Sequence, residues 1–230
     1  MSQSHILRDF DVAIAALRGE VLAMATRARL NLERGVQALL TRNVELANAV
    51  IADDDEVDEG ERKIDQLGMD IMVRYHPVAT DLRLVVSSMR ISMNLERISD
   101  HAVNIAKRAR KMAASQELPD ATLIEPLYTL ADHLLRDAIS AYSDRDAALG
   151  AALHARDKEL DRMHNAANAT FGNRIEQGTN RSQDYLHLIL VTRSLERVGD
   201  LAVNIGEDAV FLDHARDLRH TSDRTLDTDR

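Results

Sequence analysis

The chain has 230 residues, of which 45% are hydrophobic and 29% charged, and its formal net charge is −9. This length fits one large domain or two small ones. The acidic balance argues against general nucleic-acid binding, which needs Lys and Arg to neutralise phosphates, and against direct adhesion to anionic lipid. Without Cys, the chain has neither a disulfide framework nor a thiolate metal site.

Hydropathy along the chain predicts a protein that does not insert into a membrane. No stretch approaches the ~20 apolar residues that a membrane span requires. The N-terminal residues Met1–His5 lack the basic start and the following apolar segment of a secretory signal. We therefore expect a cytoplasmic protein.

The spacing of apolar residues, taken in chain order, predicts an all-α fold. Only 3 Pro and 9 Gly interrupt the chain. Pro77 and Gly178 fall where turns between helices are expected, and Pro119 and Pro126 flank a short linker. Between these positions apolar residues recur at three- and four-residue steps, which is typical of packed helices. We expect about six long helices and no β-sheet. The first helix shows this spacing at Phe10, Ile14, Leu17, Val21, Met24 and Ala28.

An internal repeat divides the chain into two similar halves. The segment Leu95–Ile105 matches Leu195–Ile205 at eight of eleven positions, at an offset of 100. A weaker match pairs Asp54–Asp58 with Asp157–Asp161. The repeat predicts two three-helix bundles in tandem. The predicted division is residues 1–116, residues 117–214 and a flexible charged tail at residues 215–230.

Acidic side chains lie four residues apart in each half, so each pair shares one helix face. In an antiparallel helix pair, residues equidistant from the turn lie at the same level. Asp58 and Glu96 have their midpoint at residue 77, where Pro77 marks the turn, and the second half repeats this arrangement beside Gly178. Glu96 and Asp100 also interrupt a row of apolar residues that runs along one side of their helix from Leu82 to Val103. We therefore expect like charges to crowd at a seam of each bundle, where burial adds a desolvation cost.

Such a carboxylate seam persists most easily when cations bind to it. Carboxylate oxygens suit hard ions such as magnesium, manganese, calcium or iron(III), and do not suit zinc-type nitrogen and sulfur sites. Asn104 and Asn204 lie one turn further along and could add an amide oxygen. The alternative is that Arg97 and Arg197 neutralise the acids through salt bridges within the bundle. The predicted metal ligands are Asp54, Asp58, Glu96, Asp100 and Asn104 in the first half, and Asp157, Asp161, Glu196, Asp200 and Asn204 in the second.

These motifs make the chain similar to the PhoU family over nearly its whole length. The chain departs from the family pattern at Leu201, where the family often has His. A second departure is Lys107, which stands where the second half has Glu207. The resemblance adds Glu207 to the second metal site and implies a smaller or less highly charged cluster in the first. The segments that carry the resemblance are Pro77–Leu84, Leu95–Ala106, Leu195–Asp200 and Asn204–Glu207.

The resemblance implies a non-enzymatic negative regulator of phosphate uptake. Such a protein is expected to restrain the phosphate ABC transporter through its ATPase subunit and to keep the partner sensor histidine kinase from starting the phosphate-starvation response. It is also expected to bind iron, manganese or magnesium and to form a homodimer. Two alternatives stay open: a multinuclear metal-dependent phosphoester hydrolase and a metal-storage bundle. A hydrolase needs a proton-transfer group beside open metal positions, and no such group recurs in both halves.

Overall fold

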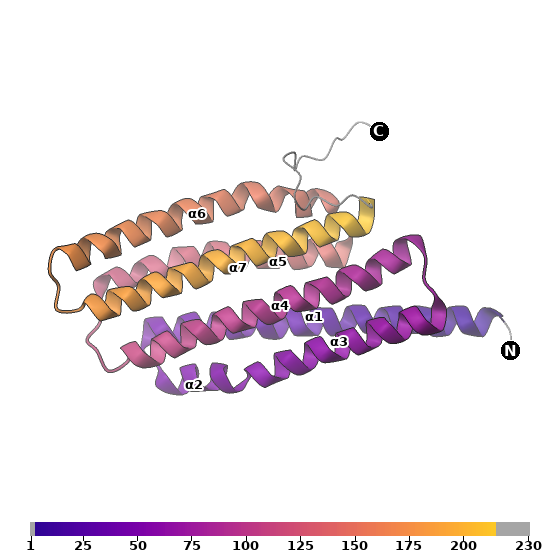
Figure 1. The fold of residues 1–230 in the computed structure, drawn as a ribbon, viewed down its shortest axis with the longest axis horizontal. Coiled ribbons are helices and arrows are strands. Elements are labelled where there is room, and N and C mark those ends of the chain that lie inside the picture. The colour runs from indigo at the N-terminus through magenta and orange to yellow at the C-terminus, as the bar shows by residue number, and fades with distance from the viewer. Residues whose placement is uncertain (1–2, 215–230) are drawn as a thin grey trace.

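The fold consists of long α-helices, with no β-strand among the residues described (Figure 1). The computed structural model describes residues 3–214, and the side chains of residues 8–213. The tail predicted at residues 215–230 lies outside this range. Within residues 3–214, no helix combines the length and apolar character needed to cross a membrane. The elements are α1 Gln3–Thr41, α2 Val44–Ala52, α3 Asp54–Tyr75, α4 Ala79–Met112, the 3-10 helix η1 Pro119–Leu123, α5 Ile124–Asp144, α6 Ala147–Glu176 and α7 Ser182–His214.

The residues that break the apolar pattern lie at the turns between helices. After α3, His76 adopts a left-handed conformation with φ 49°, and Pro77 follows before α4 begins. Gly178, with φ 81°, lies in the turn between α6 and α7. Pro119 begins η1, and Pro126 lies in the first turn of α5, just after the segment that joins the two halves. Proline is tolerated there because the first N–H groups of a helix have no partner within the helix.

Between α1 and the turn at Pro77, the chain forms two helices, α2 and α3. Asn43 caps α2, because its side chain accepts a hydrogen bond from the backbone N–H of Leu46 at 2.8 Å. Asp53 separates the two helices, and its carboxylate pairs with Arg34 of α1 at 3.2 Å. Helix α2 has only 9 residues, whereas each of the six other described α-helices, α3 included, has 21 or more. The prediction of six long helices is therefore confirmed, with a short additional helix before α3.

The two halves, α1–α4 and α5–α7, pack along their lengths. The long helices run along the long axis of the molecule, with α4 and α7 side by side at its middle (Figure 1). Buried residues of both halves belong to one continuous hydrophobic core. Polar contacts cross the same boundary: the hydroxyls of Ser88 and Tyr142 are 2.7 Å apart, and Arg29 Nε donates to Asp132 Oδ1 at 2.5 Å. The relative position of α4 and α7 thus depends on packing between the halves.

Candidate metal centre

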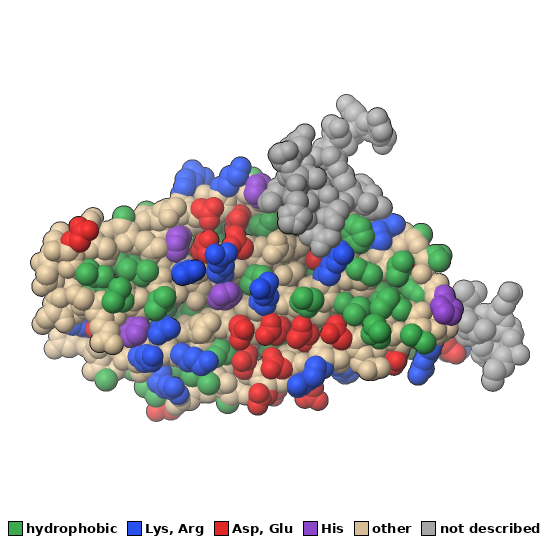
Figure 2. All heavy atoms as spheres, in the orientation of Figure 1, with side chains coloured by type: hydrophobic (Ala, Val, Ile, Leu, Met, Phe, Trp, Pro, Cys, Tyr) green, Lys and Arg blue, Asp and Glu red, His purple; other side chains and the backbone are tan. Residues whose placement is uncertain are grey.

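The first acidic cluster lies on the seam between α3 and α4. Asp54 and Asp58 project from α3, and Glu96 and Asp100 project from α4. Their charges act on one another, since Asp100 and Asp58 raise the pKa of Asp54, and all three aspartates raise the pKa of Glu96. Figure 2 shows acidic side chains gathered over this pair of helices. The shared midpoint at residue 77 therefore places the four predicted carboxylates of the first half within range of one another's charges.

Glu96 is the most perturbed carboxyl group of this cluster. Its pKa is raised from an ordinary 4.5 to about 7. Burial is the largest cause, followed by the charges of Asp100 and Glu61. A carboxyl group with this pKa is only partly ionised at neutral pH, because desolvation and like charges both disfavour the anion.

A chain of hydrogen bonds from the core orients Asp54. Asn31 of α1 is buried, and its amide donates to the Ser99 hydroxyl at 3.3 Å. Ser99 then donates to Asp54 Oδ1 at 3.2 Å. Burial nevertheless raises the pKa of Asp54, since desolvation outweighs the effect of this hydrogen bond.

Glu61 belongs to the first cluster, although sequence reasoning did not include it. It lies three residues after Asp58 on α3, and its charge raises the pKa of Glu96. Burial raises the pKa of Glu61 itself, and Asp65 and Asp58 add to that effect. The three-residue spacing from Asp58 was the available signal, because residues three apart share a helix face.

The second cluster, between α6 and α7, is partly neutralised by basic side chains. Burial raises the pKa of Glu196, and the charges of Asp200 and Asp161 add to it, whereas Arg197 and His164 lower it. Arg197 forms ion pairs with Glu196 at 3.6 Å and with Asp200 at 3.0 Å. In the second half, therefore, Arg197 neutralises part of the acidic charge through salt bridges, as the alternative to metal binding predicts.

Differences at equivalent positions explain why the two clusters are unequal. At the offset of 103 that relates the acidic segments, Glu61 corresponds to His164. Arg97, unlike its counterpart Arg197, makes no ion pair with any described residue. Lys107 does lower the pKa of Asp54, but it is the weakest of the influences on that carboxyl group. The acids of the first cluster thus have fewer basic partners than those of the second. The expectation of a smaller or less highly charged first metal site stays a prediction.

The remaining predicted ligands are Asn104, Asn204, Asp157 and Glu207. Asn104 and Asn204 are exposed and line a cavity between α4 and α7, together with Asp157 and Asp200. Glu207 is only 8% exposed. It lies seven residues beyond Asp200, which is about 10 Å along the helix at ~1.5 Å per residue.

The donor chemistry of the first cluster fits a hard cation. Among residues 3–214, no three His, Asp or Glu side chains are arranged as a ready metal-ligand group. The fit therefore depends on the type and crowding of the donors: Asp54, Asp58, Glu61, Glu96 and Asp100 offer only carboxylate oxygens. Such oxygens are the ligands preferred by magnesium, calcium and manganese.

The two halves each match the same family model. Residues 21–109 and residues 124–209 both match the PhoU domain, in agreement with the internal repeat. A Pseudomonas putida protein named phosphate-specific transport system accessory protein PhoU homolog is 31% identical over 217 residues, which cover 94% of this chain and 85% of the relative. A Pseudomonas aeruginosa protein of the same name is 30% identical over 217 residues, covering 94% of this chain and 90% of the relative.

Solved structures agree with the helical architecture. The crystal structure of PhoU from Pseudomonas aeruginosa superposes with a TM-score of 0.87 and 29% identity, covering 90% of this chain and all of the other. The phosphate transport system regulatory protein PhoU from Streptococcus pneumoniae has a TM-score of 0.84 and 22% identity, covering 91% of this chain and 99% of the other. The second comparison concerns the fold alone.

Proposed function

The chain belongs to the PhoU family, and we propose that it acts as an accessory regulator of phosphate uptake and not as an enzyme. The observation that carries this proposal is the doubled PhoU-domain match, over residues 21–109 and 124–209. Relatives named as accessory proteins of the phosphate-specific transport system support the same role.

The proposed regulation is negative and takes place in the cytoplasm. When phosphate is plentiful, the chain docks on the ATPase subunit of the phosphate ABC transporter and restrains uptake. It also holds the partner sensor histidine kinase inactive, and it does so as a homodimer. The name of the relatives, which places them in a transport system, supports a partner in a membrane complex.

Metal ions complete the proposed adaptor. Iron, manganese or magnesium would bind first at the α3–α4 seam, held by Asp54, Asp58, Glu96 and Asp100. The raised pKa of Glu96 supports this order, because a cation relieves the repulsion that the first cluster leaves unbalanced. When bound, the ion supplies positive charge, and the carboxylates hold α3 and α4 in register around it. In the second half, the ion competes with Arg197 for Glu196 and Asp200.

Affinity capture from membranes tests the adaptor. The tagged chain is expressed in cells grown in high phosphate. The membranes of these cells are solubilised with manganese present, and the tagged chain is captured on an affinity resin together with the proteins bound to it. We expect to recover the transporter ATPase or the histidine kinase, with less recovered by Asp100→Asn. Glu45→Gln is the matched control, because Glu45 is an exposed acid in the first turn of α2. Recovery of neither partner by the wild-type chain contradicts the proposal.

A phosphatase assay separates the adaptor from the hydrolase. Metal-loaded protein is incubated with a chromogenic phosphomonoester, and we expect no steady turnover. Steady hydrolysis by the wild type and by Glu45→Gln, but not by Asp100→Asn, would assign an enzymatic role instead.

A further inference from the structure

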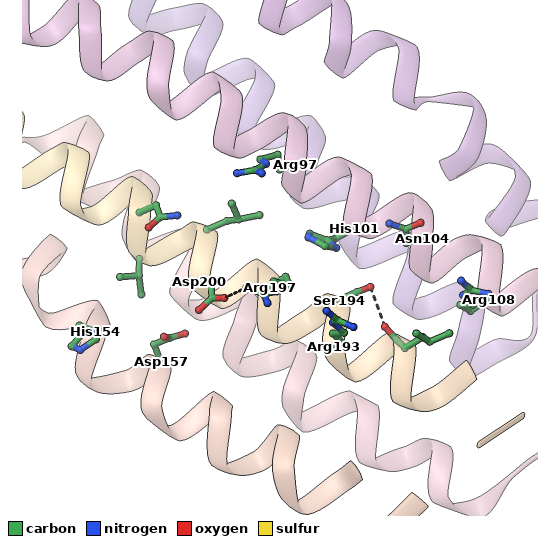
Figure 3. Close-up of a pocket in the computed structure, with 14 residues that line it drawn as sticks. Arg97, His101, Asn104, Arg108, His154, Asp157, Arg193, Ser194, Arg197 and Asp200 are labelled. Carbon is green, nitrogen blue, oxygen red and sulfur yellow. Dashed lines mark hydrogen bonds and ion pairs between the residues drawn. The ribbon is translucent and has the colours of Figure 1, made fainter. Parts of the chain in front are cut away.

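A large polar cavity lies between the two halves, on the face where α4 and α7 run side by side. Its volume is about 820 Å³. Arg97 and Arg108 of α4 and Arg193 and Arg197 of α7 line it, and we call this cavity the arginine groove. Figure 3 shows Arg97 between the two helices, with Arg193 and Arg197 on α7.

The arginine groove concentrates positive charge on an acidic protein. The chain carries a net charge of −9, yet four guanidinium groups line one cavity. Figure 2 shows basic side chains and histidines lying between two separate groups of acidic side chains on this face. Asp157 and Asp200 line the same cavity, so four guanidinium groups stand against two carboxylates and the groove keeps a formal excess of positive charge. Charges farther away than about 8–10 Å are screened at physiological salt.

Three of these arginines are available for a ligand. Among the described residues, Arg97, Arg108 and Arg193 make no ion pair and no side-chain hydrogen bond with the protein. Arg97 and Arg193 are also exposed. Arg197 differs, since Glu196 and Asp200 hold it at one end of the groove. The unpaired positive charge is therefore spread along α4 and the middle of α7.

The spacing and lining of the groove indicate the class of ligand. Arg97 and Arg108 are eleven residues apart, which is roughly 16 Å along α4 at ~1.5 Å per residue. Arginines distributed over this length can contact several phosphate groups of one ligand at once, and a cavity of this volume is in the range that holds larger ligands. No Phe, Tyr or Trp lines the groove to stack on a nucleobase. Recognition would come from guanidinium groups, whose planar fork donates two hydrogen bonds to a phosphate.

We propose that the arginine groove binds an anion carrying at least two linked phosphate groups, recognised through its phosphates. Asn104 and Asn204 line the same groove and offer neutral amide donors beside the guanidinium groups. Asp157 and Asp200 line the part of the groove next to α6, and Asp200 is paired with Arg197 there, so the ligand lies toward Arg97, Arg108 and Arg193. The groove binds such an anion whether or not the chain regulates phosphate uptake.

Isothermal titration calorimetry of the full chain tests the proposal. The protein is freed of metal with EDTA, dialysed, and titrated at low salt with orthophosphate, diphosphate, tripolyphosphate and ATP. We expect affinity to increase with the number of linked phosphates, and to fall as salt is raised. ATP should bind no more tightly than tripolyphosphate. Equal affinity for orthophosphate and tripolyphosphate, or clearly tighter binding of ATP, would overturn the assignment, as would the absence of binding at millimolar tripolyphosphate.

Matched variants locate the site. Arg97→Gln and Arg193→Gln should each weaken tripolyphosphate binding about ten-fold, as expected for a lost charge-assisted hydrogen bond. Arg74→Gln is the control, because Arg74 is exposed in the last turn of α3 and does not line the groove. Asp200→Asn should strengthen binding by releasing Arg197. The proposed site is contradicted if Arg74→Gln loses as much tripolyphosphate affinity as Arg97→Gln and Arg193→Gln, or if none of the three loses affinity. Circular dichroism confirms that each variant is folded.

Discussion

Replacing Glu96 by Gln should stabilise the metal-free protein at alkaline pH. In the folded chain, burial and the neighbouring carboxylates raise the pKa of Glu96 to about 7, from an ordinary value of 4.5. An acid whose pKa is raised by folding binds its proton more tightly in the folded state. The corresponding stability is fully present below pH 4.5 and is lost as the pH rises through about 7. Gln keeps the shape of the protonated side chain and has no charge to lose.

The size of the effect follows from the interval between the two pKa values. At ~1.4 kcal/mol per pKa unit, this interval of about 2.5 units corresponds to at most about 3.5 kcal/mol. Glu96 is only half-buried, so solvent screens its interactions, and we expect about 1–2 kcal/mol. Glu196 provides the internal comparison, because Arg197 offsets part of its repulsion. Glu196→Gln should therefore gain less than Glu96→Gln.

Urea unfolding with EDTA present, at pH 5, 7 and 8.5, measures these differences. The wild-type free energy of unfolding should fall between pH 5 and 8.5, and it should fall less in Glu96→Gln. The variant should exceed wild type by about 1–2 kcal/mol at pH 8.5, with a smaller difference at pH 5. Identical pH profiles for wild type and Glu96→Gln, or a larger gain in Glu196→Gln, would refute the reasoning that the first cluster is the less balanced one.

Other consequences are open to measurement. Manganese at about 100 times its Kd should raise the melting temperature by about 5–10 °C at pH 8 and by less at pH 5, and Glu96→Gln should reduce this shift. Gly150→Ala should cost about 1–3 kcal/mol in urea unfolding, because its Cβ would lie 2.6 Å from a backbone carbonyl oxygen of α7. Gly172→Ala, in the same helix with no atom within 4 Å of its Cβ, should instead gain about 0.5–1 kcal/mol. Tyr142→Phe should lose about 1 kcal/mol, since it removes the buried hydrogen bond to Ser88.

Much of the fold could be predicted because its local signals agree. The apolar spacing, Pro77 and Gly178 together define two antiparallel hairpins, and the turns lie where those residues predict them. The break between α2 and α3 was harder to see. Asn43 gives a local signal for the start of α2, whereas Asp53, where that helix ends, makes its ion pair with Arg34 of a different helix.

The sequence predicted the positions of the candidate metal ligands only where a single turn joins the two helices that carry them. Asp58 and Glu96 share a hairpin, so their distances from Pro77 are enough to set them at one level. The three-residue spacing between Asp58 and Glu61 was visible in the sequence, but the rotation of α3 that turns Glu61 toward Glu96 is decided by packing. The arginine groove could not be predicted in this way, because α4 and α7 are not joined by a turn. Their register depends on contacts between the halves, such as Arg90 with Asp208.

The duplicated halves have diverged in charge, and this divergence links the two proposed sites. Arg197 faces both of them, because it pairs with Glu196 and Asp200 while lining the arginine groove. A cation bound by those two acids would compete with Arg197, and a freed guanidinium would add to the positive field of the groove. Linkage then requires the reverse effect, in which a phosphate-bearing anion that draws Arg197 away increases the cation affinity of the second cluster. The first cluster lacks this connection, since Arg97 pairs with none of its acids. Cation binding in the second half should therefore depend on the anion, whereas binding in the first half should not.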